Sequence, residues 1–309
     1  MMTMAMEYQH KQVLLVGLAC LDIITVCGHF PIEDEDFRAD DHYWQCGGNA
    51  CNSAVVLQQL GDQCNLMACL SENCPQSDYI LQKLTNIGIK SNWCIRHIGH
   101  KTPISTVLIN KKNGSRTIMH YSWLPELTLD NFQNRVQFDN LDWIHFEGRR
   151  KNMLEIGRMM DYIRLRYKDR IKISVELEKK DENSLQLIPK ADVIFIGKDF
   201  AQAFGHDNAT DCLRAFYPLA QSSAIMICPW GDYGADGIGP PQSNIVHADA
   251  LTLDEVVDTL AAGDTFLAGT IHSLRKGESL LKSISYGCKL AGTKCKQRGL
   301  MFEKIPTDH

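Results

Sequence analysis

The sequence has no long hydrophobic run and no excess of basic residues. Its 309 residues include 32 Lys and Arg against 37 Asp and Glu, a formal net charge of −5 that argues against an extended nucleic-acid surface. A membrane-spanning helix needs about 20 consecutive apolar residues, and no segment reaches that length. Residues 1–12 also lack the apolar centre and cleavage site of a signal peptide. We therefore expect a cytoplasmic protein that binds neither nucleic acid nor membrane.

Cysteine is abundant, but its spacing lacks the pattern of a metal site. The chain has 12 cysteines, yet no Cys-x-x-Cys pair and no accompanying pair of histidines separated by three to five residues. Most of the cysteines sit among apolar residues, which favours buried, reduced thiols. A metal- or thiol-based interaction module therefore has only the cysteine count in its favour.

Several common phosphate-binding motifs are also missing. The chain has no P-loop motif, no His-Arg-Asp or Asp-Phe-Gly sequence, and no Gly-x-Gly-x-x-Gly after its first apolar run. These absences exclude P-loop and protein-kinase schemes and count against a classical dinucleotide site. Any phosphate chemistry must use another arrangement of amides and side chains.

Short apolar runs alternate with helical patterns along most of the chain. The five strand-like runs are 13–17, 142–146, 171–175, 193–196 and 224–228. Helical patterns, including 152–167 and 209–219, separate several of them. This alternation predicts an α/β fold with a mostly parallel sheet flanked by helices. Ligands of such sheets bind beyond the carboxyl ends of the strands.

Two segments interrupt this alternation. Residues 23–44 contain the acidic run 33–36, and residues 102–121 have the pattern of a hairpin around Asn113-Gly114. We expect these two segments to form a small β-sheet lid over the carboxyl end of the main sheet. The α/β core then comprises residues 1–22, 45–101 and 122–309.

The segment 256–266 is the first candidate for chemistry. It has the pattern of a short strand at Val256-Val257, then a turn of small residues, then Asp264 at the start of an apolar helix. Small residues let the backbone approach a ligand, and a helix start offers unpaired N–H groups to an anion. Asp264 could deprotonate a hydroxyl beside that anion, or it could only favour the helix dipole.

A second candidate segment, residues 47–52, opens an apolar helix that stops at Gly61. Asn49 and Asn52 are three residues apart and share one face of the first turn, where two amides can bind the hydroxyls of a sugar. Asn49 could instead be an N-cap, which would leave Asn52 without a role. Asp22 follows the apolar run 13–21 and could accept two hydroxyl hydrogens, or be an ordinary surface carboxylate.

Other polar residues are weaker candidates. Arg116 leaves the hairpin turn and could bind a phosphate or be an exposed turn cation. The glycine-rich run 230–237 could offer backbone amides to a nucleotide, although glycine turns are common after strands. Arg149 is a further anion candidate. His145 lies within an apolar run and is expected to be a core residue rather than a general base.

Taken together, segments 47–52 and 258–264 resemble the two signatures of the ribokinase family of sugar kinases. Further motifs resemble the ketohexose-phosphorylating branch of that family, among them 143–149, Lys198-Asp199 and 287–295. The resemblance extends from about residue 11 to residue 299. It implies a ribokinase-like fold and the ATP-dependent phosphorylation of a ketohexose, chiefly D-fructose at its 1-hydroxyl.

The resemblance also implies a role for each site residue. Asp264 is then the base that takes the proton from the sugar hydroxyl, and the backbone amides of Ala261, Ala262 and Gly263 form the anion hole. The implied sugar-binding residues are Asp22, Gly48, Asn49, Asn52 and Asp264. The implied ATP-binding residues are Arg116, Gly231, Asp232, Tyr233, Gly234, Ala261, Ala262, Gly263, Cys288 and Ala291.

The same resemblance implies Mg²⁺-ATP as phosphate donor, K⁺ as an activator, and a homodimer whose β lids clasp one another. Two features depart from the family. Ala261 stands where this branch usually has glycine, and the broader family's Asn-x-x-Glu motif is missing around residues 197–200, so the magnesium ligands stay unassigned. The alternatives are a kinase of the same family acting on ribose, an aldohexose or a nucleoside, and a non-catalytic sugar-binding relative.

Overall fold

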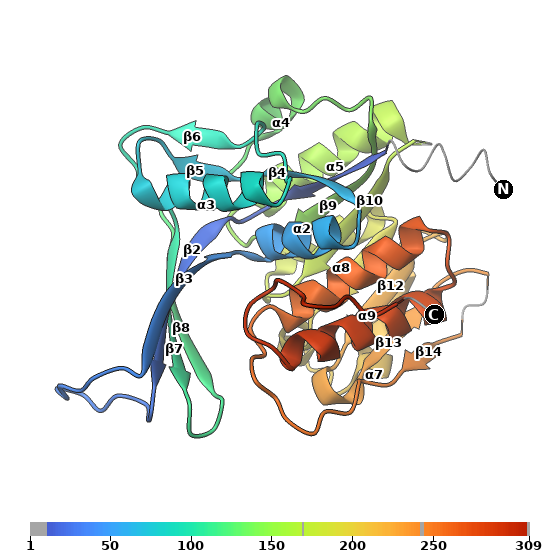
Figure 1. Cartoon of the computed structure of the whole chain (residues 1–309). Coiled ribbons are helices and arrows are strands. Elements are labelled where there is room, and N and C mark those ends of the chain that lie inside the picture. The colour runs from blue at the N-terminus through green and yellow to red at the C-terminus, as the bar shows by residue number, and fades with distance from the viewer. Residues whose placement is uncertain (1–10, 169, 242–243, 308–309) are drawn as a thin grey trace.

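The computed structural model describes residues 11–168, 170–241 and 244–307, with a large sheet at its centre (Figure 1). The strands of this sheet are β1 Gln12–Val16, β4 Gln63–Met67, β9 Leu141–Glu147, β10 Lys172–Leu177, β11 Val193–Ile196, β12 Ile225–Pro229, β13 Ala235–Ile238 and β14 Val246–Ala248. They lie in the order β14-β13-β12-β11-β10-β9-β1-β4. All neighbours from β4 to β12 are parallel, and β13 and β14 complete one edge in antiparallel pairing. The expected mostly parallel sheet is confirmed.

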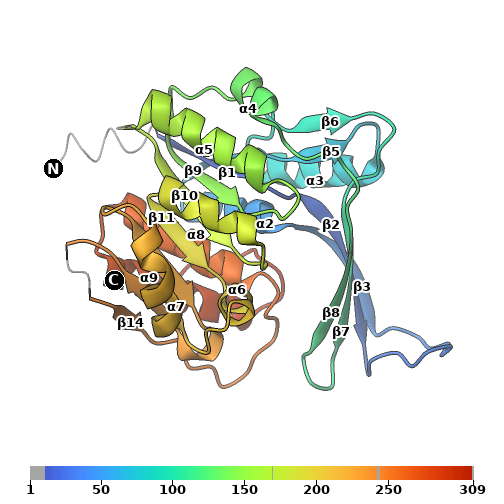
Figure 2. The same cartoon turned by 180° about the vertical axis from the view of Figure 1, so that it is seen from behind.

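Helices cover both faces of the large sheet (Figures 1 and 2). The α-helices are α2 Asn49–Gln59, α3 Pro75–Asn86, α4 Leu129–Arg135, α5 Met153–Tyr167, α6 Lys198–Ala203, α7 Ala209–Phe216, α8 Ala262–Arg275 and α9 Leu280–Cys295. The 3-10 helices are η1 Glu182–Lys190, η2 Tyr217–Leu219 and η3 Gly231–Tyr233. The core on one face includes side chains of α2, α8 and α9, and the core on the other face includes side chains of α4, α5 and α7.

Strand β1 shows why the main strands are recognisable in the sequence. Val13 and Leu15 belong to the core under α2 and α8, whereas Leu14 and Val16 belong to the core under α5. Because successive side chains point to opposite faces, a strand buried on both faces must be apolar at every position. The uninterrupted apolar run of β1 follows from this.

A second sheet of four strands stands apart from the large sheet, at the lower left of Figure 1. We call it the lid sheet; its strands are β2 Cys20–Cys27, β3 Asp41–Gly47, β7 Ile104–Asn110 and β8 Arg116–Tyr121, in the order β3-β2-β7-β8. Strands β7 and β8 form the expected antiparallel hairpin. Two short strands, β5 Cys69–Ser71 and β6 Ile95–His97, pair separately.

The structure corrects two sequence-based expectations. Asp22 does not follow the first core strand; it lies within β2, because the apolar run 13–21 contains the end of one strand, a turn and the start of another. Val256 and Val257 do not form a strand, and their side chains are 54% and 43% exposed. The N–H groups of Val257 and Asp258 both donate to the Cys295 carbonyl at the end of α9, so they take no part in a sheet.

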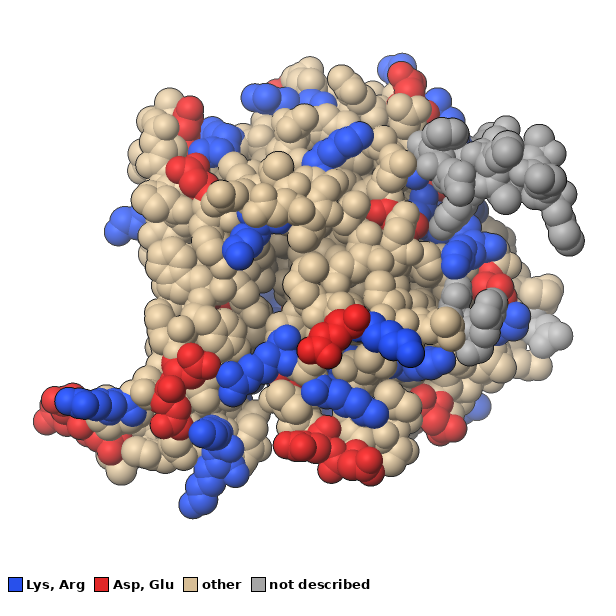
Figure 3. All heavy atoms as spheres, in the orientation of Figure 1, with Lys and Arg blue, Asp and Glu red and all other residues tan. Residues whose placement is uncertain are grey.

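All 12 cysteines are free thiols, and most of them are buried. Among the described residues, no helix is both long and apolar enough to cross a membrane. Basic and acidic side chains are interspersed over the face seen in Figure 3. The stretch 1–12, for which no signal peptide was expected, lies almost entirely outside the described residues.

Candidate active site

The carboxyl ends of the parallel strands open into a cleft of ≈ 940 Å³. Glu147 ends β9, Glu176 lies near the end of β10, and Gly197 and Lys198 follow β11; all four line the cleft. The lid sheet supplies another wall, through residues such as Asp22. This is the edge at which sheets of this kind bind ligands.

The cleft brings together most of the site residues expected from the sequence. Those that line it are Asp22, Gly48, Asn49, Asn52, Arg116, Gly231, Ala261, Ala262, Gly263 and Asp264. The remaining expected nucleotide residues, Asp232, Tyr233, Gly234, Cys288 and Ala291, are not among its lining residues. The two segments that carried the family resemblance thus meet in one cleft, whereas the outer part of the expected nucleotide site lies beyond it.

Other contacts explain the positions of some of these outer residues. Tyr233 is 74% exposed on η3. Gly234 has a left-handed φ of 88°, and a Cβ at this position would lie 2.0 Å from the Ala248 carbonyl oxygen, so glycine is required here by packing against β14. Cys288 is buried in α9, and its Sγ lies 3.7 Å from the same carbonyl.

Helix α8 presents its amino-terminal end to the cleft. It starts after Ala261, which has a left-handed φ of 61°. The Ala262 N–H donates to the Thr259 carbonyl at 3.2 Å, but the N–H groups of Gly263 and Asp264 have no acceptor among the described residues. Two free amides at the positive end of a helix dipole are suited to bind an anion.

Asp264, the third residue of α8, is 7% exposed and accepts a hydrogen bond from Asn52 Nδ2 at 2.8 Å. Burial raises the pKa of Asp264 to about 8. The hydrogen bond from Asn52 opposes this shift, whereas the negative charges of Glu178, Glu147 and Asp22 add to it. A carboxylate with such a pKa is suited to accept a proton near neutral pH.

Asn49 is not an N-cap. The N-cap of α2 is Gly48, and no side chain caps this helix end. Instead, Asn49 Nδ2 donates to Glu176 Oε2 at 3.1 Å and to Glu178 Oε2 at 3.4 Å. Burial, and then the charges of Asp264 and Glu178, raise the pKa of Glu176 well above its usual value.

Two glycines shape the turn before α2. A Cβ on Gly47 would lie 2.2 Å from Asp22 Oδ2, so only glycine leaves room for that carboxylate. Gly48 has a φ of 97°, and a Cβ there would lie 2.4 Å from the Leu18 carbonyl oxygen. The Asp22 side chain is 5% exposed, and burial raises its pKa, although hydrogen bonds from Ser105 and Cys20 oppose this shift.

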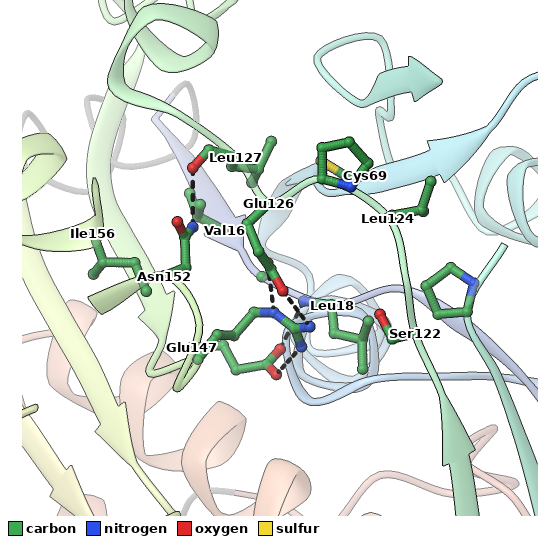
Figure 4. A pocket seen from close by; sticks show the side chains of 14 residues that line it. Val16, Leu18, Cys69, Ser122, Leu124, Glu126, Leu127, Glu147, Asn152 and Ile156 are labelled. Carbon is green, nitrogen blue, oxygen red and sulfur yellow. Dashed lines mark hydrogen bonds and ion pairs between the residues drawn. The ribbon is translucent and has the colours of Figure 1, made fainter. Parts of the chain in front are cut away.

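Glu147 fixes the start of α2 to the main sheet. Its Oε2 accepts hydrogen bonds from Leu18 N at 2.8 Å and Ala50 N at 3.2 Å, and its Oε1 lies 3.2 Å from Arg149 Nη1. Arg149 also makes two hydrogen bonds of 2.9 Å to Glu126 (Figure 4). Arg149, a weak anion candidate from the sequence, is thus held by two carboxylates.

The small cavity of Figure 4, ≈ 20 Å³, is about the size of one water molecule.

The turn before α8 is held from two sides. Asp258 accepts hydrogen bonds from Leu260 N at 2.8 Å and from the fully buried Lys294 Nζ at 2.6 Å. From the other side, Arg116 of the lid sheet donates to Thr259 Oγ1. Leu260 itself packs against lid-sheet side chains. The free amides of α8 are therefore positioned by both α9 and the lid sheet.

His145 is a core residue, as expected from the sequence, whereas three glutamates of the cleft had no predicted role. His145 is buried, its Nδ1 lies 2.9 Å from Ser174 Oγ, and burial lowers its pKa to about 3, as suits a core residue. The sequence had indicated no role for Glu147, Glu176 and Glu178. The available signal was a glutamate at the end of each of two successive apolar runs, where parallel strands meet a ligand.

The chain is similar over nearly its whole length to sugar kinases. Residues 10–308 match the family described as pfkB family carbohydrate kinase. Mouse ketohexokinase is 37% identical over 297 residues, which cover 94% of this chain and 98% of the mouse protein. This similarity confirms the resemblance to the ketohexose-phosphorylating branch.

Solved structures of ribokinases share the fold. Ribokinase from Giardia lamblia has a TM-score of 0.81 at 13% identity, with 94% of each chain covered. Ribokinase from Cryptococcus neoformans var. grubii, in complex with ADP, has a TM-score of 0.73 at 16% identity, with 96% of this chain and 97% of that chain covered. The expected ribokinase-like fold is confirmed.

The left-handed conformation of Ala261 leads to a prediction about stability. It costs an alanine about 1–2 kcal/mol, which glycine avoids. Replacing alanine by glycine would remove this cost, but the greater freedom of glycine in the unfolded chain lowers stability by about 0.4–1 kcal/mol. We expect Ala261→Gly to raise the free energy of unfolding by about 0.5–1 kcal/mol, measured by denaturant titration of tryptophan fluorescence.

Ala262→Gly is the matched control for this prediction. Ala262 is the first residue of α8 and is not among the positive-φ residues of the described chain. Glycine there should lower the free energy of unfolding by about 0.4–1 kcal/mol, because of its greater freedom in the unfolded chain. Equal losses in both variants would show that Ala261 is not left-handed in solution.

Proposed function

The chain belongs to the pfkB family of carbohydrate kinases, which makes it a phosphotransferase with an alcohol acceptor, and we propose that it transfers the terminal phosphoryl group of ATP to the 1-hydroxyl of a ketohexose, chiefly D-fructose. The observation that carries the proposal is the 2.8 Å hydrogen bond between Asn52 and Asp264. It sets the sugar-binding segment directly against the candidate base. The similarity to mouse ketohexokinase supports the acceptor class.

In the proposed reaction, Asp264 accepts the proton of the acceptor hydroxyl. The oxygen of that hydroxyl attacks the terminal phosphorus of ATP in line, and the bond to the leaving ADP oxygen breaks. The free N–H groups of Gly263 and Asp264 would stabilise the negative charge on the transferring group. Ala261 and Ala262 form the same turn, but the Ala262 N–H expected in this role already donates to the Thr259 carbonyl. Catalysis then depends on positioning and charge stabilisation.

The proposed acceptor site uses side chains of α2 and the lid sheet. Asp22 can accept two hydroxyl hydrogens, and Gly47 leaves space beside it. Asn52 donates to Asp264 through Nδ2, while its buried Oδ1 has no partner among the described residues. A buried acceptor without a partner is costly, so a sugar hydroxyl at this atom would be favourable. Asn49 would bind a further hydroxyl from the same helix face.

The nucleotide would lie on the other side of Asp264. We propose Arg116 and the loop from Gly231 to Gly234 as its binding residues, with Cys288 and Ala291 at its outer end. Among the described residues, no group of three or more His, Cys, Asp or Glu side chains could hold a metal ion. This suits Mg²⁺, which in kinases is held by one or two carboxylates together with phosphates and water.

Glu176 and Glu178 are our candidates for those carboxylates. Both line the cleft, and the negative charges of Glu178 and Asp264 raise the pKa of Glu176 further after burial has raised it, so a cation there would relieve repulsion. Bound Mg²⁺ would neutralise charge on the phosphates. Activation by K⁺ and a cytoplasmic location stay predictions from the resemblance and the composition.

We further propose that the lid segments 23–44 and 102–121 clasp a second copy of the chain. The face of the lid sheet turned away from the cleft carries a row of residues paired across its strands: Trp44 with Ile23, Ile23 with Thr106, and Thr106 with Met119. Trp44 is 43% exposed and Met119 is 56% exposed. Exposed apolar side chains gathered on one face favour burial against a partner.

Replacing Asp264 tests the proposed reaction. Loss of a general base lowers the rate by about 10²- to 10⁴-fold. We expect the wild-type protein to form ADP fastest with D-fructose in a panel that also contains tagatose, ribose and adenosine, each with and without K⁺. Asp264→Asn should bind D-fructose in calorimetry but lose turnover to that extent.

Three outcomes would each contradict a part of the proposal. Near-normal turnover by Asp264→Asn would exclude Asp264 as the base. Binding of D-fructose by the wild-type protein without ADP formation would instead favour a non-catalytic sugar-binding protein. Faster turnover of ribose or adenosine would keep the kinase and replace the acceptor.

The raised pKa of Asp264 predicts the pH dependence of the reaction. Only the deprotonated carboxylate can accept a proton, and burial moves its pKa to about 8. We therefore expect kcat/KM for D-fructose to rise with pH and to level off above about pH 8, because kcat/KM reports groups of the free enzyme. Initial rates between about pH 6 and pH 9 at low sugar concentration measure this. A profile that is already level at pH 6 would contradict the assignment.

The proposed clasp predicts the state of association. Sedimentation velocity should give twice the chain mass of 34.9 kDa. Met119→Lys on the outer face of β8 should shift the protein toward the single chain, because a charge would be buried at the contact. Leu165→Lys on α5, at an 80% exposed position, is the matched control and should leave the mass unchanged. Equal behaviour of both variants would exclude the lid sheet as the contact.

A further inference from the structure

A polar row crosses the lid sheet on the face that lines the cleft. The strand register pairs Gln45 with Asp22, Asp22 with Ser105, and Ser105 with His120. Residues directly opposite one another on adjacent strands share one face of a sheet. Asp22, Ser105 and His120 all line the cleft. His120, at the outer end of the row on β8, has no role in the proposed reaction.

The next row along the same face is different in character. Val107 pairs with Ile118, and both line the cleft. The polar row is therefore a separate band on the lid, at the level of the acceptor carboxylate Asp22 and distinct from the apolar band beside it.

Polar contacts join Asp22 to His120. Cys20 Sγ donates to Asp22 Oδ1 at 3.3 Å and lies 3.7 Å from Ser105 Oγ. Ser105 Oγ in turn lies 3.2 Å from His120 Nδ1. This contact orients the imidazole ring and occupies one of its two nitrogens. Within the described part of the chain, no group makes a hydrogen bond to the other nitrogen, Nε2.

The charges around His120 suit a neutral ring. Partial desolvation of the ring, which stays exposed on the cleft side of β8, and then the positive charge of Arg149, lower the pKa of His120, against the opposing effect of Asp22 and Glu126. A neutral imidazole has one donor and one acceptor nitrogen, so Nε2 can pair with a hydroxyl in either tautomer. A sugar hydroxyl, which both donates and accepts, is the matching group.

We infer that His120 is a further acceptor-binding residue, which recognises a sugar hydroxyl through Nε2 from the lid sheet. This inference rests on the proposed function, because it assumes a sugar held between Asp22 and Asp264. A sugar bound in this way would contact the core through Asn52 and Asp264 and the lid sheet through Asp22 and His120. His120 would then contribute to the choice among sugars that all present a hydroxyl to Asp264.

The test removes the two imidazole nitrogens and keeps an aromatic ring at this position. In His120→Phe, we expect the KM for D-fructose to rise about 3- to 10-fold, the worth of one neutral hydrogen bond. The kcat and the KM for ATP should change by less than about twofold, because the contact is present before and during the reaction alike. His120→Gln, which keeps a donor and an acceptor, should recover most of the affinity.

His42→Phe is the matched control. His42 also lies in the lid sheet, and its Nδ1 is 3.3 Å from the Thr25 hydroxyl, but it does not line the cleft. The control should keep the wild-type KM. Equal rises in KM for both variants would show a general effect on the lid sheet and would overturn the inference.

Deoxy analogues of D-fructose identify the hydroxyl. One analogue, lacking the hydroxyl that meets His120, should have a raised KM with the wild-type protein but no further rise with His120→Phe. If every analogue loses as much affinity with the variant as with the wild type, the inference is wrong. Should His120→Phe fail to fold, the same comparison is made with His120→Gln. With that variant, only the analogue that lacks the contacted hydroxyl should show a smaller rise in KM, relative to D-fructose, than it shows with the wild type.

Turnover by the wild-type protein separates the two possible failures. If it does not phosphorylate D-fructose, the proposed function is wrong. If it does and His120→Phe keeps the wild-type KM, the proposed function stands and only the role of His120 is wrong.

Discussion

The hydrogen bond from Asn52 to Asp264 is the contact on which the arrangement of the site depends. It joins the first turn of α2 to the first turn of α8, two helices that pack against each other under one face of the large sheet. Because both side chains are nearly buried, neither can move without leaving a polar group unpaired. The contact thus holds the amides that we propose for sugar binding at a fixed position relative to the free amides of α8. Glu147 and Lys294 extend this support, the first to β9 and the second to α9.

The register of the lid sheet gives it a polar face toward the cleft and an apolar face on the outside. Its strands pair so that polar residues face the cleft, from Asp22 to His120, while the neighbouring row, one residue along, turns Trp44 and Met119 outward. The period of two in a strand makes this possible without any change in backbone. A shift of one residue in the pairing would exchange the two surfaces, so the register carries both the proposed acceptor contact and the proposed clasp.

The large sheet and the centre of the site could be predicted from the sequence. The position of Asp22 and the contacts of Glu147 and His120 could not, for physical reasons. Strands buried on both faces are continuous apolar runs, so 193–196 was located with its correct bounds. Asp22 was misplaced because the run 13–21 contains two strands, and only Gly17 marks the turn between them in an otherwise apolar stretch. A glutamate at the end of an apolar run marked the position of Glu147, but neither its contact with the start of α2 nor the proposed role of His120 can be read from a local pattern, because both depend on segments that are distant in the sequence.

The buried carboxylate of Asp264 lowers the stability of the folded chain when it is charged. Its ordinary pKa is 3.8, and burial raises it to about 8 in the folded chain. Between these values the folded state binds the proton more tightly than the unfolded state does, so the stability from this group is full below about pH 4 and is lost as pH rises toward 8. The deprotonated carboxylate, which the proposed reaction requires, is therefore the less stable form. Ligands that bring positive charge or hydroxyl donors bind this form preferentially and return part of that stability. The crowded carboxylates of the cleft thus oppose folding once they are charged, and the proposed substrates would offset part of this cost.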